Sequence, residues 1–224
     1  MNVKFVCLAN SRKLGGRCVA GLRTDGSGWI RPVSVLPDGT LFEQHYILSD
    51  GSETSLLDIV EVCVSSHKPE PNQPENWVLL EKQKWQRLGR IESKEAYELL
   101  KPYLTAQSNL FGNTSDNIPF SKGQVNVMPA SLAIIEPSNV SWYIDYYGDT
   151  RKTHALFKLY GVSYNLRITD PHWELRLGGL GVGTHSRDAG KIGENDKLLF
   201  TISLGIPFGG KCYKLVAGII HLPN

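Results

Sequence analysis

Short apolar runs rich in β-branched and aromatic residues recur along most of the chain, separated by turns of Gly, Pro, Asn and Asp. Runs of this length and composition predict β-strands. In the clearest one, Leu56–Ser65, the residues Ile59, Glu61 and Cys63 alternate with three valines. The strands expected on this basis are Val3–Ala9, Arg17–Leu22, Trp29–Val33, Leu56–Ser65, Asn76–Leu80, Ser131–Ile135, Asn139–Tyr146, Thr153–Tyr160, Val162–Thr169, Lys197–Leu204 and Cys212–His221.

The middle of the chain has a different pattern. A helical spacing of apolar residues begins at Ser93, a residue suited to a helix N-terminus, and Pro102 limits the length of this amphipathic helix. A polar, loop-like stretch follows. We therefore expect a helical and loop connector over residues 91–130, between an N-terminal half, 1–90, and a C-terminal half, 131–224.

Strands and helices do not alternate along the chain, which disfavours a parallel α/β sheet. The expected fold is mainly β, with two small barrels in tandem and a helical connector. Composition fits a globular protein, with 41% hydrophobic and 21% charged residues in 224, and this length accommodates two small cores. Strand pattern alone does not separate a barrel from a sandwich.

No stretch approaches the roughly 20 apolar residues of a membrane span, and the N-terminus is too short in its apolar run for a signal peptide. We therefore expect no membrane association and a cytoplasmic location. No metal site and no cofactor are expected either, because cysteines and histidines lack the spacing of ligand pairs. The residues concerned are Cys7, Cys18, Cys63, Cys212, His67, His154 and His185.

Positive charge is concentrated near the N-terminus, although the formal net charge of the whole chain is only +2. Residues 1–35 contain six basic residues and one acidic residue, a net charge of +5. Basic residues gathered on one part of a fold are typical of a phosphate-binding surface. They also occur on ordinary solvated faces, and charge alone favours neither interpretation. The basic residues are Lys4, Arg12, Lys13, Arg17, Arg23 and Arg31.

The strongest candidate site is a basic loop that joins the first two expected strands. Gly15 and Gly16 allow the backbone of this loop to approach a ligand closely, and its amides can form an anion-binding nest. Side chains of the loop add cations and short hydrogen-bonding groups. The candidate binding residues are Asn10, Ser11, Arg12, Lys13 and Arg17.

Trp29 and Arg31 extend this candidate site, because residues two apart in a strand point to the same face. An indole beside a guanidinium can stack a base and hold its phosphate, and stacking contributes about 1–3 kcal/mol per base. The alternative is that Trp29 fills the barrel core and Arg31 pairs with an acid.

Two secondary candidates lie in the C-terminal half. In the first, Asp170 and His172 form an acid–base pair or Trp173 stacks a ligand, although no nucleophile or metal accompanies them. A structural turn at Asp-Pro is the alternative. The second consists of Lys211 and Lys214, which either extend a basic track or solubilise a strand end.

The strings CLANSRKLGGRCVAG and GWIRPVS near the N-terminus, and YNLRITDP, FTISLG and CYKLVAGII near the C-terminus, resemble the dual OB-containing domain family. The intermediate strings LLDIVEV and QPENW are compatible with it. The resemblance implies two OB-like barrels in tandem, a nucleic-acid role and a prokaryotic, defence-associated setting. It implies no established catalytic residues.

The leading hypothesis is a module that binds single-stranded DNA or RNA through the basic loop and the Trp29–Arg31 strand face. A second hypothesis is a sensor or enzyme that acts on a nucleotide-like ligand, with Asp170 and His172 as the residues to test. A third is an adaptor that docks a protein partner. Catalysis is left open by the sequence, and no catalytic residue is assigned.

Overall fold

The computed structural model describes residues 1–80, 82–121 and 128–224. Strands make up 52% of the described residues and helices 12%, so the predicted mainly β, OB-like fold is confirmed. The described residues form two compact units. The first contains residues 1–92 with 128–131, and the second contains residues 93–121 with 132–224.

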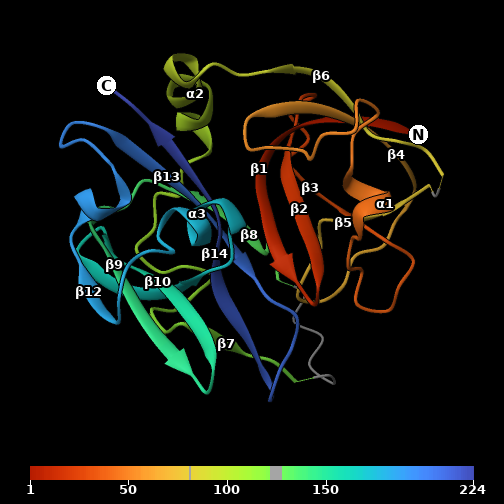
Figure 1. Ribbon diagram of the computed structural model, residues 1–224. Helices are drawn as coiled ribbons and strands as arrows, with labels where there is room; N and C mark the ends of the chain where they lie inside the picture. The colour runs from red at the N-terminus through yellow and green to blue at the C-terminus, as the bar shows by residue number, and fades with distance from the viewer. Residues whose placement is uncertain (81, 122–127) are drawn as a thin grey trace. The chain divides into compact units, whose positions relative to one another are not determined.

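The first unit is a closed five-stranded barrel with one added strand (Figure 1). Its strands pair in the order β1-β2-β3-β5-β4, and β4 returns to β1 to close the ring. All these pairs are antiparallel except β3–β5, which is parallel. The elements are β1 (Asn2–Lys13), β2 (Gly16–Arg23), β3 (Trp29–Val33), α1 (Glu43–Tyr46), β4 (Asp58–His67), β5 (Asn76–Leu79) and the added strand β6 (Gln86–Arg90).

Alternation along the strands fills the barrel of the first unit. On β4, Val60, Val62 and Val64 point into the core while the residues between them are half-buried. Trp85 closes the core, with its ring edge-on to Phe5 at 6.1 Å between centroids. These side chains bury the apolar surface that stabilises the barrel.

The second unit repeats the same strand order. Its sheet runs β12-β9-β10-β11-β14-β13-β8, and β11–β14 is again the parallel pair. The first three long strands form a meander, and a helix precedes the last two, as in the first unit. The elements are α2 (Ser93–Leu100), η1 (Lys101–Tyr103), β7 (Asn117–Pro119), β8 (Leu132–Ile135), β9 (Ser138–Tyr147), β10 (Thr150–Leu159), β11 (Val162–Ile168), α3 (Pro171–Arg176), β12 (Gly183–His185), η2 (Arg187–Gly190), β13 (Lys197–Leu204) and β14 (Lys211–Leu222).

Aromatic residues dominate the core of the second unit. Trp142 on β9 lies 5.2 Å from Trp173 on α3, and Phe157 on β10 stacks on Tyr164 of β11 at 5.4 Å between centroids. Because the even-numbered residues of β9 and the odd-numbered residues of β10 face this core, their neighbours point to the outer side of the sheet. That outer side carries most of the polar side chains of β9, β10 and β11.

Candidate nucleic-acid interface

The basic loop of the sequence is a two-residue hairpin between β1 and β2. Leu14 and Gly15 both have positive φ, 45° and 83°, the combination that a tight hairpin turn with right-handed strand twist requires. Gly16 approaches the backbone of the segment after β3 so closely that an added Cβ would lie 2.2 Å from the carbonyl oxygen of Leu41. The structure therefore favours glycine at position 15 because of its positive φ, and at position 16 because a neighbouring backbone leaves no room for a side chain.

Asn10 and Arg17 are brought together by one carboxylate. Asn10 Nδ2 donates to Glu53 Oε1 and to the carbonyl oxygen of Thr54, both at 2.8 Å, and Arg17 Nε donates to the same Glu53 oxygen at 2.7 Å. The Arg17 guanidinium also lies over the ring of Tyr46, 5.6 Å from its centroid. These contacts hold the base of the hairpin against the segment that precedes β4.

The remaining hairpin residues differ in exposure. Arg12 is exposed beside Arg17, which it faces across the β1–β2 pair. Lys13 is half-buried and donates to the carbonyl oxygen of Asp38, and burial lowers the pKa of its ammonium group. Ser11 is buried, and its hydroxyl donates to the carbonyl oxygen of Cys18 at 3.4 Å.

Trp29 and Arg31 do not lie at the hairpin. Trp29 is half-buried and pairs with Leu22, five residues along β2 from Arg17, a separation of about 17 Å along the strand. Arg31 has no exposed surface, and its backbone N–H donates to the carbonyl oxygen of Glu75 at 2.9 Å. The candidate residues of the first unit therefore divide into a hairpin group and a strand group.

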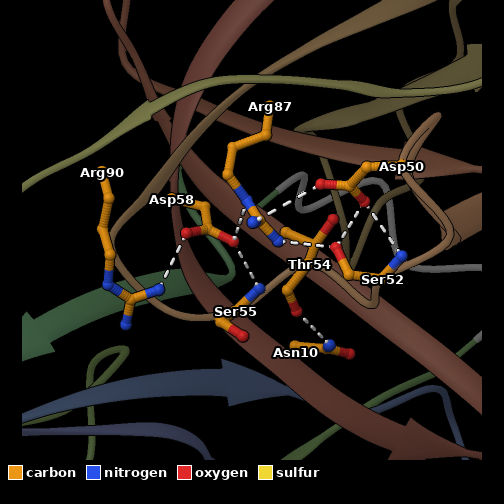
Figure 2. A network of polar contacts seen from close by, with 8 residues as sticks. All are labelled: Asn10, Asp50, Ser52, Thr54, Ser55, Asp58, Arg87 and Arg90. Atoms are coloured by element: carbon orange, nitrogen blue, oxygen red, sulfur yellow. Dashed lines mark hydrogen bonds and ion pairs between the residues drawn. The ribbon is translucent and has the colours of Figure 1, made fainter.

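A network of arginines and carboxylates adjoins the hairpin (Figure 2). Asp58, at the start of β4, accepts from Arg90 at 2.8 Å and from Arg87 at 3.3 Å, both of which come from β6. Arg87 continues the network to the hydroxyl of Ser52 at 2.7 Å and to the carboxylate of Asp50 at 3.6 Å. Figure 2 also shows Asn10 beside Thr54 next to this network, which links it to the hairpin.

The role of this network follows from the burial of Asp58. The Asp58 side chain is 1% exposed, whereas those of Arg87 and Arg90 are 35% and 52% exposed. A buried carboxylate requires charged or hydrogen-bonding partners, and here it fixes two guanidinium groups at the surface. Sequence reasoning missed these arginines because they lie on a short strand with no apolar alternation.

The first secondary candidate is built into a helix start. Asp170 is the N-terminal cap of α3 and accepts from the backbone N–H groups of His172 and Trp173, at 2.9 and 3.3 Å. Its other oxygen accepts from the N–H of Ile219 at 3.0 Å, and burial raises the pKa of this carboxyl group. His172 is exposed, whereas Trp173 is buried and its indole N–H donates to the carbonyl oxygen of Ile219.

The two lysines of β14 have different surroundings. Lys211 is exposed at the first position of the strand. Lys214 is 1% exposed, and its ammonium group donates to the carbonyl and side-chain oxygens of Asn113, at 2.8 and 2.7 Å. Burial lowers the pKa of Lys214 to about 8. Only Lys211 therefore presents its charge to solvent.

The described residues contain neither a metal-binding cluster nor a membrane-spanning helix. Outside position 81 and residues 122–127, no group of three or more His, Cys, Asp or Glu side chains has the arrangement of a metal centre. Within the same residues, no helix combines the length and apolar character that crossing a membrane requires.

Comparison with known proteins gives a family match over nearly the whole chain. The family model described as "Dual OB-containing domain" matches residues 3–219. No curated protein matches the sequence. One solved structure, titled "Structure of murine DNA binding protein bound with ds DNA", shares 7% identity at a TM-score of 0.34, with 100% of this chain and 98% of that chain covered. A TM-score this low supports no conclusion about the present chain.

Proposed function

We propose that this chain, which belongs to the dual OB-containing domain family, binds single-stranded DNA or RNA through the first of its two units. OB folds generally bind oligonucleotides, and the loop between their first two strands is one of the elements that they use. In this chain that loop is the hairpin that carries Arg12. The family resemblance also supports a setting in prokaryotic defence.

The proposed binding surface, here called the arginine surface, consists of Arg12, Arg17, Arg87 and Arg90. Its parts are connected through two neighbouring residues, Ser52 and Glu53. At the hairpin Arg17 donates to Glu53, and on β6 Arg87 donates to the hydroxyl of Ser52. Three carboxylates lie among the four arginines. Guanidinium groups bind phosphate through paired N–H donors.

The observation that carries the proposal is the pair of arginines held by buried Asp58 beside the hairpin. Groups fixed before binding lose less conformational entropy when a ligand arrives. A preorganised pair of guanidinium groups, in the same unit as exposed Arg12, offers paired donors to the phosphates of a strand. Arg31, which is buried, and Trp29, at the other end of β2, are not part of this surface.

Fluorescence anisotropy with labelled single-stranded DNA, single-stranded RNA and duplex, at low and moderate salt, tests the proposal. We expect affinity to fall steeply with salt, because each phosphate contact releases a counterion. Arg12→Glu and Arg90→Glu should each weaken binding about ten-fold and flatten the salt dependence by about one unit of slope. Lys94→Glu, an exposed charge reversal on α2, is the matched control.

Absence of binding at low salt would refute the proposal. Unchanged affinity in both arginine variants would refute the arginine surface as the binding site. Trp29→Ala separates the two ends of β2: a loss confined to this variant would place the ligand on the strand face instead. Parallel titrations with mononucleotides distinguish a polymer ligand from a nucleotide ligand.

A further inference from the structure

Residues 105–120 of the second unit, here called the strap, contain no helix and no strand apart from β7. All of them are described, and Leu110 alone among them is buried, while the others are half-buried or exposed. Leu110 belongs to the apolar core of the unit, and Phe111 packs against that core. A segment with so few buried apolar contacts has a low local stability and can open without global unfolding.

Hydrogen bonds tie the first half of the strap to two strands of the unit. The N–H of Thr105 donates to the carbonyl oxygen of Ile134 on β8 at 2.9 Å. The hydroxyl of Tyr164 on β11 donates to the carbonyl oxygen of Ser108 at 2.5 Å and accepts from the N–H of Leu110 at 3.2 Å. The strap is therefore attached to the barrel at separate points rather than along its length.

The second half of the strap covers an edge of β14. β11 pairs with β14 at Arg167 and Ile168, whereas the earlier residues Lys211–Tyr213 pair with β7. At this point the other edge of β14 is occupied by Gly205 and Phe208 of the β13–β14 connection. Unpaired N–H and C=O groups along a strand edge are a template for another extended chain. The strap therefore covers an edge that β11 leaves free.

One buried cation fastens the middle of the strap. Lys214 on β14 is 1% exposed, and its ammonium group donates to the carbonyl and side-chain oxygens of Asn113, at 2.8 and 2.7 Å. Its backbone N–H donates to the carbonyl oxygen of Asp116 at 2.8 Å. Asn113 also shapes the strap, because it accepts from the N–H of Ser115 and donates to the carbonyl oxygen of Asn117. These hydrogen bonds of Lys214 therefore end on the strap.

The titratable and charged groups around the Lys214 ammonium come from β11, β14 and the strap. The ring of Tyr164 has its centroid 5.7 Å from Nζ, and Asp116 attracts the charge. Burial outweighs this attraction and lowers the pKa of Lys214 from 10.5 to about 8. Burial also raises the pKa of Cys212, two residues earlier, to about 11, so its thiol stays protonated between pH 7 and 9. The protonated lysine is therefore a buried charge whose hydrogen-bond acceptors, the two oxygens of Asn113, are uncharged.

We propose that the strap is a proton-linked cover of the β14 edge, which opens more readily when Lys214 is protonated and closes more firmly when Lys214 is neutral. Opening hydrates the ammonium group, detaches β7 from β14 and withdraws Leu110 from the core. All of these groups belong to the second unit, so the strap is independent of nucleic-acid binding by the first.

The direction and size of the effect follow from the two pKa values of Lys214. In the open strap the ammonium group is hydrated and its pKa returns to its ordinary value, so the open state binds the proton more tightly and a lower pH favours opening. Values of 10.5 and about 8 correspond to an opening constant about 300-fold larger below pH 8 than above pH 10.5. From pH 9 to pH 7 the increase is about ten-fold. Release of Cys212 to its ordinary pKa of 9.0 would offset this by at most about two-fold.

Hydrogen–deuterium exchange of the full chain at pH 7 and pH 9 tests the proposal. The amides of Leu110, Phe120 and Lys214 donate across the contacts of the strap, so their protection relative to an unstructured peptide reports closure. We expect this protection to be about ten-fold greater at pH 9 than at pH 7. At both pH values it should be lower than the protection of β13, because the strap opens without unfolding the unit.

Variants of the clasp identify the titrating group. Lys214→Met keeps a side chain of similar length without a charge, and it should abolish the pH dependence. Lys211→Met, at an exposed lysine of the same strand, is the matched control and should retain it. Asn113→Ala should lower protection about ten-fold at both pH values, because the ammonium group loses its side-chain acceptor.

Two results would overturn the proposal even if Lys214→Met does not fold. Protection of the strap equal to that of β13 at both pH values would show that the strap does not open separately. Equal protection at pH 7 and pH 9 in the wild type would remove the link to protonation. In a folded Lys214→Met, a pH dependence like that of the wild type would assign the proton to another group, and no loosening in Asn113→Ala would refute Asn113 as the acceptor that fastens the strap.

Discussion

Truncation of Asp58 gives the most direct test of how the first unit is built. Asp58→Ala removes a carboxylate that is 1% exposed and accepts three hydrogen bonds. Arg90 donates to one oxygen at 2.8 Å, and Arg87 and the backbone N–H of Ser55 donate to the other at 3.3 and 2.9 Å. All three donors lose their acceptor in the variant.

The expected loss of stability follows from the exposure of these donors. Buried hydrogen bonds to charged groups contribute about 1.5–3 kcal/mol. Arg87 and Arg90 are 35% and 52% exposed, so water replaces much of what they lose, and each pair contributes about 0.5–1 kcal/mol. The bond from Ser55 adds about 1 kcal/mol. Asp58→Ala should therefore lower the free energy of unfolding by about 2–3 kcal/mol.

Urea-induced unfolding, followed by the fluorescence of the five tryptophans, which include buried Trp85 of the first unit, measures this change. Lys4→Ala is the control, because Lys4 is 55% exposed and 3.8 Å from Glu61, and should cost less than about 0.5 kcal/mol. A double-mutant cycle with Arg90→Ala should yield a coupling of about 0.5–1 kcal/mol. A loss no larger than that of the control, or no coupling, would refute the assignment of Asp58 as the residue that fixes these arginines.

Three further predictions concern single positions. Gly16→Ala should destabilise the first unit by about 1–3 kcal/mol in urea unfolding, because the new Cβ would lie 2.2 Å from a backbone oxygen, whereas Gly89→Ala, with open space around it, should be nearly neutral. Asp170→Ala should cost about 3 kcal/mol by the same assay, since it removes a helix cap and leaves a buried N–H unpaired. The hydrogen bond from His221 is the main cause that lowers the pKa of Asp196 from 3.8 to about 2. The wild type should therefore be more stable than Asp196→Asn above pH 3.8, and this difference in the free energy of unfolding should disappear as pH falls towards 2. Acid unfolding of both proteins measures the difference.

Strands made of apolar, buried residues were predictable from the sequence, whereas short exposed elements were not. The expected strand Trp29–Val33 has the bounds of β3, and Lys197–Leu204 has those of β13. The strand β6 was missed because all but one of its residues are exposed and no alternation marks it. The helix α3 was also missed, although Asp170 followed by proline is a readable helix start.

Side-chain direction was predictable, but burial was not. Trp29 and Arg31 share a strand parity, yet one is half-buried and the other has no exposed surface. Residues on both faces of β3 are buried, so period-two alternation does not identify the solvent side. Lys214 is a similar case, because Asn113, the residue that accepts its hydrogen bonds, lies 101 positions away in the sequence.

Local charge counts overestimated the basic character of the N-terminal segment for the same reason. Lys4 pairs with Glu61 and Arg17 pairs with Glu53, and both acids lie outside residues 1–35. The net charge of +5 in that segment is therefore a property of the sequence window rather than of a surface. Folding brings the neutralising carboxylates from distant segments, and the sequence gives no distance between them.

An arginine that is paired with a carboxylate can nevertheless bind phosphate when the carboxylate is buried and the guanidinium group is exposed. Asp58 is inaccessible, so a ligand meets the guanidinium groups of Arg87 and Arg90 without approaching the carboxylate that holds them. Water screens an exposed charge more strongly than a buried one, but a phosphate that touches the arginines is nearer to them than to Asp58. Because the two guanidinium groups are already fixed, they lose less conformational entropy on binding. This gain offsets part of the attraction for phosphate that the negative charge of Asp58 cancels. Affinity at this surface should therefore depend on the positions of a few arginines more than on the net charge of the unit.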